Sequence, residues 1–214
     1  MRNSKQLIVG IIDDDEAIRE SLHLLLFSAD LPCQVYASAD EFLSRTDAHE
    51  FSCLLLDIRM PGTDGLELFR ILQHENAPYP VLFITGHGDI PLAVSAIKQG
   101  AFDFLTKPFK RGELLEKVKS AITHCENQRT QLQSRHELKQ RVDSCTPRER
   151  DVMQLMVRGL TSKSIADNLA ISPRTVEIHR AHVMEKMQAA SLPALVQMLT
   201  QLRSFPDEKG GESH

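Results

Sequence analysis

Residues that could handle a phosphoryl group stand at separate places in the N-terminal half of the chain. Asp13 and Asp14 follow one apolar run, and Asp57 ends a second. Thr85 ends a third such run, and Lys107 follows a fourth. Gathered carboxylates call for a hard divalent ion such as Mg²⁺, and an ionised carboxylate beside it can attack phosphorus to form an acyl phosphate. The sequence therefore predicts phosphoryl transfer onto Asp57, with an ammonium and a hydroxyl on the phosphoryl oxygens.

Such chemistry requires elements that bring these residues together. The chain alternates short apolar runs with amphipathic segments, which predicts a doubly wound five-stranded parallel sheet of the α/β class. The expected strands are residues 7–12, 33–36, 53–57, 81–85 and 102–105. The expected helices are residues 16–28, a short one from 40, 65–75, 90–98 and one from 110 onward. Because the carboxyl ends of parallel strands share one edge, the acids, the hydroxyl and the ammonium should converge near Asp57.

Each of these residues also has a simpler explanation when it is taken alone. One or more of Asp13, Asp14 and Asp15 could cap the following helix. Thr85 could be an ordinary strand residue, and Lys107 could belong to an ordinary loop. The functional interpretation is favoured by the joint pattern at four of the five strand ends: a pair of acids, one acid, a hydroxyl and an ammonium, in that order along the chain.

Four motifs together resemble the receiver domain of bacterial two-component response regulators. They are Ile12-Asp13-Asp14-Asp15, Asp57-Ile58-Arg59-Met60-Pro61, Ile84-Thr85-Gly86-His87-Gly88 and Lys107-Pro108-Phe109. The resemblance implies a flavodoxin-like fold in which Asp57 accepts phosphate from a sensor histidine kinase. It also implies that Mg²⁺ is held by Asp13, Asp14, Asp57 and the backbone carbonyl of Arg59, and that Thr85 and Lys107 contact the phosphoryl group. Phe104 matches the family's switch aromatic, which turns inward when Thr85 moves.

The C-terminal half has the pattern of a small helical domain. Thr146 is a candidate N-cap with Glu149 three residues later, and further helices are expected over residues 161–169, 173–187 and 193–202. The middle pair reads as helix, turn, helix. In its second helix Val176, His179 and Val183 recur at helical spacing with Met187, which predicts a core stripe and a structural His179. The opposite, polar face could enter a major groove, although an ordinary solvent face has the same composition.

This half resembles the LuxR-type helix-turn-helix of the NarL/FixJ response regulators, and within them the FixJ branch. The motifs are Thr146-Pro147-Arg148-Glu149-Arg150, Lys163-Ser164-Ile165-Ala166 and Ser172-Pro173-Arg174-Thr175-Val176-Glu177-Ile178-His179. By position, the residues that would face DNA bases are Glu177, Ile178 and Ala181. Those nearer phosphates are Lys163, Arg174, Thr175, His182 and Lys186. The family dimerises through its last helix, where the apolar stripe includes Leu192, Leu195, Val196 and Leu199.

The resemblances imply a phosphorylation-controlled transcription factor and not a multiple-turnover enzyme, with only self-phosphorylation and slow autodephosphorylation at Asp57. The implied partners are a sensor histidine kinase, an inverted repeat of double-stranded DNA, a second copy of the chain on phosphorylation, and RNA polymerase. Two other classes stay open. A phosphoaspartyl hydrolase would use the same nucleophile, although Arg59 stands where such enzymes place a second Asp. A receiver with an RNA-binding or inert helical tail is the other.

Length, charge and composition set the domain boundaries. We expect a receiver over residues 6–122, a helical linker over 123–142, a DNA-binding domain over 143–204 and a disordered tail over 205–214. Residues 1–123 carry 12 basic and 18 acidic side chains, net −6, whereas residues 144–202 carry 7 and 5, net +2. The acidic first half would repel phosphate backbones and the second half would not, although a basic excess of this size is by itself weak evidence for nucleic acid binding. No long apolar run or signal peptide is apparent, which favours a cytoplasmic protein without membrane contact.

Overall fold

The structure is a computed structural model that describes residues 8–45 and 51–204, apart from the side chains of residues 87, 203 and 204. The chain divides into two compact units, Met1–Arg129 and Thr130–His214. The expected tail over residues 205–214 and the first two residues of the expected receiver lie outside the described residues. None of the described helices is both long enough and apolar enough to cross a membrane.

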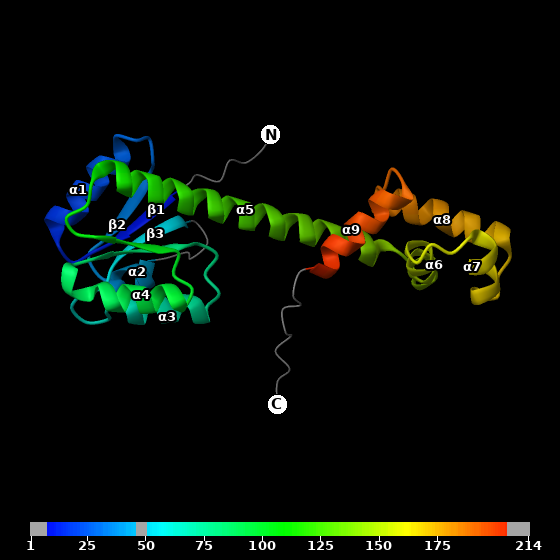
Figure 1. The fold of residues 1–214 in the computed structure, drawn as a ribbon, viewed down its shortest axis with the longest axis horizontal. Helices are drawn as coiled ribbons and strands as arrows, with labels where there is room; N and C mark the ends of the chain where they lie inside the picture. Colours follow the sequence, from blue (N-terminus) through cyan, green and yellow to red (C-terminus); the bar gives the residue numbers. More distant parts are fainter. Residues whose placement is uncertain (1–7, 46–50, 205–214) are drawn as a thin grey trace, which may run out of the picture. The chain divides into compact units, whose positions relative to one another are not determined.

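The first unit contains a five-stranded parallel sheet with strand order β2-β1-β3-β4-β5 (Figure 1). Its strands are β1 (Ile8–Ile12), β2 (Cys33–Tyr36), β3 (Phe51–Asp57), β4 (Val81–Thr85) and β5 (Asp103–Thr106). All seven residues of β3 are buried, as its unbroken apolar run predicts for a strand covered on both faces. The predicted doubly wound α/β fold is confirmed, and its strand bounds differ from prediction by only a few residues.

Helices cover both faces of this sheet. They are α1 (Glu16–Phe27), α2 (Ala39–Arg45), α3 (Gly65–His74), α4 (Ile90–Lys98) and α5 (Arg111–Ser144), with a 3₁₀ turn, η1 (His87–Asp89), before α4. Helices α1 and α5 pack on one face through a core that includes Leu22, Leu55 and Leu114. Helices α2, α3 and α4 pack on the other through a core that includes Phe42, Leu56 and Leu68 (Figure 1). Both faces of the sheet are therefore buried under helices.

A glycine allows α3 to begin directly beside the end of β3. The Gly65 amide donates to the carbonyl of Ile58 at 3.0 Å. A Cβ atom at Gly65 would collide with the backbone oxygen of Asp57. The side chain of Asp64 caps α3 by accepting from the amide of Glu67. The short loop after Asp57 is thus fixed at both ends.

The second unit is helical. It contains α6 (Pro147–Val157), α7 (Ser162–Leu169), α8 (Pro173–Met187) and α9 (Leu192–Ser204), and α5 runs through the boundary between the units. The expected linker over residues 123–142 lies within α5. Thr146 and Glu149 form the predicted capping box of α6. Val176, Val183 and Met187 are fully buried at the centre of this unit's core, as their spacing predicts.

Candidate functional site

The register of the sheet brings the ends of four strands to one edge. Ile12 of β1 pairs with Leu56 of β3, so Asp13 lies level with Asp57. On the other side of β3, Asp57 pairs with Ile84, and Thr85 pairs with Thr106. Lys107, the next residue after β5, donates its backbone N–H to the carbonyl of Thr85 at 2.8 Å. Residues that are up to 94 positions apart in the chain therefore meet at one place.

A three-residue charge cluster forms the centre of this edge. The ammonium of Lys107 lies 2.7 Å from Oδ2 of Asp13 and 2.6 Å from Oδ1 of Asp57. Both carboxylates are almost fully buried, with side chains 2% and 8% exposed. Two buried carboxylates thus share one ammonium. Because their summed charge exceeds that of the ammonium, the arrangement leaves an unbalanced negative charge that a further cation could neutralise.

Burial has the largest effect on Asp57. It raises the pKa of this carboxyl above its ordinary value, and the hydrogen bond from Lys107 only partly opposes the shift. Burial also pushes the pKa of Lys107 down, but its hydrogen bonds to Asp13 and Asp57 outweigh that effect and leave it raised. A dication beside Asp57 would favour the ionised, nucleophilic carboxylate.

The other oxygen of Asp57 is held by the loop that follows β3. The backbone N–H of Arg59 donates to Oδ2 of Asp57 at 2.7 Å. The guanidinium of Arg59 in turn binds Oδ1 of Asp89 through two nitrogens, at 2.8 and 2.6 Å. This ion pair ties the loop after β3 to the turn after β4. It could not be predicted from the sequence, because nothing in the spacing of two residues 30 positions apart signals a contact.

The three acidic residues after β1 have different contacts. Asp15 is the N-cap of α1, and its side chain accepts from the amides of Ala17 and Ile18. Oδ1 of Asp13 accepts from the amide of Asp15 at 2.9 Å, and Oδ2 binds Lys107 in the charge cluster. Asp14 is exposed at the same edge. The simpler explanation, helix capping, therefore applies to Asp15 and leaves Asp13 and Asp14 as candidate metal ligands.

Thr85 and Phe104 occupy the part of the edge next to β5. Thr85 is buried, and its hydroxyl donates to the carbonyl of Gly86 at 3.2 Å. Phe104 is half-buried and packs against the same core as α4. Both stand where a change at Asp57 could reach β4, β5 and α4.

In the second unit, α7 and α8 form a helix-turn-helix. Ser172 caps α8, and its side chain accepts from the amide of Thr175, a half-buried residue at the start of the helix. Five further residues of α8 that are predicted to face DNA are exposed: Arg174, Glu177, Ile178, Ala181 and His182. Lys163 is exposed on α7. Ile178 is a large apolar residue yet 49% exposed, which is suited to an apolar contact with a thymine methyl group.

Lys186, which was predicted to contact a DNA phosphate, forms an ion pair within its own unit that the sequence did not reveal. Its ammonium lies 2.6 Å from Oε2 of Glu149, whose side chain is only 4% exposed. The hydrogen bond from Lys186, followed by that from the backbone of Thr146, lowers the pKa of Glu149 to about 2. His182 also faces this acid, with Nδ1 3.3 Å from Oε1. Lys186 therefore holds α8 against α6, and the capping box was the only part of this arrangement visible in the sequence.

The stripe predicted for dimerisation is largely occupied by the core of its own unit. Leu195 is fully buried there and is not available to a partner while the unit is folded. Leu192 and Leu199 are partly buried and pack against the same core. Val196 is half-buried as well, so part of its side chain remains accessible. The reason is geometric: an apolar stripe on a terminal helix is used first to close its own domain.

Comparisons with known proteins agree with both units. Residues 9–119 match the response regulator receiver domain, and residues 143–199 match the luxR family of bacterial regulatory proteins. The chain thus belongs to the response regulators that carry a LuxR-family domain, a class of DNA-binding transcription regulators.

Individual members of this class resemble the chain over most of its length. It is 45% identical to the transcriptional regulatory protein FixJ of Bradyrhizobium diazoefficiens, over 89% of this chain and 93% of FixJ. It is 40% identical to the response regulator protein TodT of Pseudomonas putida, over 92% of this chain and 86% of TodT. Among solved structures, the response regulator StyR has a TM-score of 0.84 at 38% identity and covers 92% of this chain and 99% of its own. Full-length FixJ from B. japonicum has a TM-score of 0.59 at 42% identity, covering 94% and 99%.

Proposed function

We propose that Asp57 is the phosphoacceptor of this response regulator and that its phosphorylation controls DNA binding. The observation that carries the proposal is the bridge from the Lys107 ammonium to the carboxylates of both Asp13 and Asp57, within 2.7 Å of each. An Asp57 oxygen would form a bond to phosphorus while the phosphorus–nitrogen bond of a kinase phosphohistidine breaks, and the departing imidazole would take up a proton from solvent to leave as a neutral ring. Lys107 would then neutralise the charge on the phosphoryl oxygens.

The carboxylates at this edge suit Mg²⁺. Asp13 and Asp57 supply two hard oxygen donors, and the exposed Asp14 can add a third directly or through water. Together with the backbone carbonyl of Arg59, these residues would hold the ion, which would supply charge neutralisation at the phosphoryl group. The excess negative charge of two buried carboxylates on one ammonium supports this assignment.

Thr85 and Phe104 would carry the signal away from Asp57. If the Thr85 hydroxyl exchanges the Gly86 carbonyl for a phosphoryl oxygen, it leaves space next to β5. The ring of Phe104, already half-buried, could then turn further inward. Phosphorylation would shift the chain between two arrangements that exist beforehand, one of which favours dimers on an inverted repeat.

The DNA half of the proposal assigns α8 to the major groove. Glu177, Ile178 and Ala181 are the outward residues that would meet bases. Lys163, Arg174, Thr175, His182 and Lys186 would lie nearer phosphates. On α9, Val196 together with the partly buried Leu192 and Leu199 remains the proposed dimer contact. A sensor kinase and RNA polymerase are the protein partners we expect, and the cytoplasm is the expected compartment because the operator lies there.

The test is operator affinity with and without a small phosphodonor and Mg²⁺. Wild type should bind its operator more tightly with the donor, whereas Asp57→Asn should show no gain. The matched control is Asp30→Asn, because Asp30 is exposed and has a positive φ of 56°, a conformation that Asn also tolerates. It should respond like wild type. Equal affinities for all proteins under both conditions would reject the switch.

A further inference from the structure

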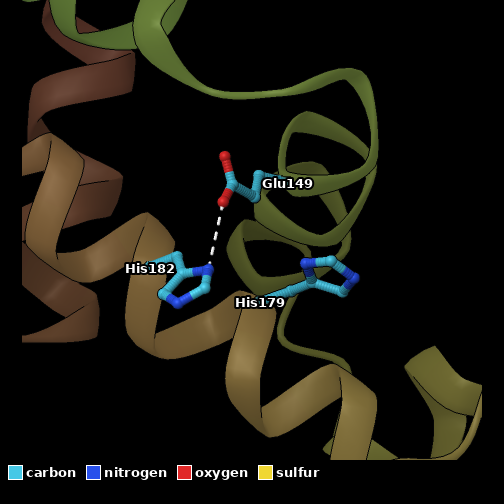
Figure 2. A group of neighbouring side chains, drawn as sticks. All are labelled: Glu149, His179 and His182. Carbon is cyan, nitrogen blue, oxygen red and sulfur yellow. Dashed lines mark ion pairs between the residues drawn. The ribbon is translucent and has the colours of Figure 1, made fainter.

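A second cluster of potential metal ligands lies in the C-terminal unit, apart from the phosphorylation pocket. Within the described part of the chain, one group of three His, Cys, Asp or Glu residues has ligand atoms close enough to share an ion. It consists of Glu149, His179 and His182, whose ligand atoms lie within 4.8 Å of one another. Figure 2 shows the carboxylate of Glu149 from α6 and the two imidazoles of α8 around a common space.

The spacing of the two histidines suits a shared ligand. They stand three residues apart on α8, so both project from the same side of the helix toward α6. Donor atoms that bind one tetrahedral Zn²⁺ at about 2.0–2.2 Å lie roughly 3.4 Å apart. Nδ1 of His182 and Oε1 of Glu149 already have this separation, at 3.3 Å. Only the His179 ring has to approach further, by about 1.4 Å at most on this geometry.

An unsatisfied nitrogen is the second observation that points to a ligand. Nδ1 of His179 is buried and has no hydrogen-bond partner among the described residues. A buried polar atom without a partner costs free energy, and a neutral imidazole nitrogen is a common donor to zinc. The predicted place of His179 in the core stripe explains why its ring is half-buried. It does not explain why Nδ1 is buried without a hydrogen-bond partner.

Glu149 can accept an ion without losing its structural bonds. Its Oε2 accepts from Lys186 at 2.6 Å and from the backbone of Thr146 at 2.8 Å, whereas Oε1 faces His182. One oxygen therefore holds the helix cap, and the other is directed at the histidines. The Lys186 ammonium would repel a dication and lower its affinity.

We propose that Glu149, His179 and His182 form a binding site for a divalent transition-metal ion of the zinc class, with water completing a four-coordinate shell. Two imidazoles and a carboxylate match the three-ligand sites in which zinc keeps an open position, and they do not suit Mg²⁺. The ion would join α6 to α8 and so tie the helix proposed to enter the major groove to its neighbour. This site depends on neither Asp57 nor the receiver pocket.

The experiment is calorimetric titration of the full chain with Zn²⁺ in excess Mg²⁺, which occupies the hard carboxylates of the receiver. The titration is made at mildly alkaline pH, because protons compete with metal ions for histidine ligands. His182→Asn removes one exposed ligand without disturbing the core. His136→Asn is the matched control, because His136 is an exposed histidine of α5 in the same unit and outside the cluster.

Wild type and His136→Asn should bind one Zn²⁺ with equal affinity, and His182→Asn should bind it at least about tenfold more weakly. Lys186→Gln keeps a hydrogen-bond donor beside Glu149 and removes the positive charge, so it should bind Zn²⁺ more tightly than wild type. Addition of Zn²⁺ should also slow amide exchange in α6 and α8 of wild type but not of His182→Asn. Absence of binding to wild type, or equal affinity for wild type and His182→Asn, would overturn the proposal.

Discussion

The two units each contain a buried carboxylate with a lysine ammonium 2.6 Å away, yet the two acids behave in opposite ways. Asp57 in the receiver has a raised pKa, and burial is the main cause. Glu149 in the helical unit has its pKa lowered to about 2, and the hydrogen bond from Lys186 is the main cause. The same pair of charged groups therefore produces a reactive, poorly neutralised acid in one place and a stable ion pair in the other.

The difference lies in how many groups share each ammonium. Lys107 serves both Asp13 and Asp57, so neither carboxylate has a full counter-charge. Lys186 serves Glu149, which also accepts a backbone N–H from Thr146. Glu149 has an ammonium of its own and fixes two helices through one oxygen, whereas the two carboxylates that share Lys107 keep a net negative charge that Mg²⁺ could neutralise before phosphoryl transfer.

The largest effect should come from removing the ammonium at the satisfied acid. Lys186→Met leaves Glu149 buried without a counter-charge, and we expect a loss of about 3 kcal/mol from the stability of the helical unit. Amide exchange in α6 and α8 measures this. Lys163→Met, at an exposed lysine of α7, is the control and should cost less than about 0.5 kcal/mol. A cost for Lys186→Met no greater than that of the control would mean that the pair is not structural.

Removing the satisfied acid itself should have the next largest effect and a characteristic pH dependence. Glu149→Gln loses a charged hydrogen bond, which costs about 1.5–3 kcal/mol at neutral pH. Because the folded pKa of Glu149 lies near 2 and its ordinary value is 4.5, the advantage of wild type is full above pH 4.5. It should disappear as the pH falls toward 2. A constant difference over that range, measured by amide exchange, would contradict the lowered pKa.

Replacing the reactive acid should do the opposite. With a raised folded pKa, ionised Asp57 destabilises the receiver at neutral pH, so Asp57→Asn should stabilise it by about 0.5–2 kcal/mol without Mg²⁺. The gain should shrink as acid protonates Asp57, and also when Mg²⁺ stabilises wild type. Tyrosine fluorescence in urea isolates this unit, because both tyrosines, Tyr36 and Tyr79, belong to it and the chain has no Trp. A destabilised variant would show that Asp57 is satisfied after all.

The smallest effect concerns DNA. Lys163→Ala should weaken operator binding uniformly and reduce the slope of log affinity against log salt by about one. Lys186→Gln should change the slope less, because Glu149 already neutralises that ammonium. Equal slopes for wild type and Lys163→Ala would remove Lys163 from the phosphate contacts. Lys139→Ala, at an exposed position of α5, is the control.

The sequence was sufficient where backbone geometry decides the outcome. Strand ends in a parallel sheet share an edge, so Asp13, Asp57 and Lys107 could be placed together from the order of apolar runs alone. The Arg59–Asp89 pair and the contacts of Glu149 with Lys186 and His182 could not be predicted in this way. They depend on side-chain rotamers and on how α6 packs against α8, and no local period records either.

Phosphoryl incorporation is the most direct measure of whether Asp57 is the acceptor. After treatment with a small phosphodonor and Mg²⁺, intact-mass measurement of the full chain should show one added phosphoryl group in wild type and in Asp30→Asn, and none in Asp57→Asn or without Mg²⁺. Equal incorporation into Asp57→Asn and wild type would contradict the assignment of Asp57 as the acceptor.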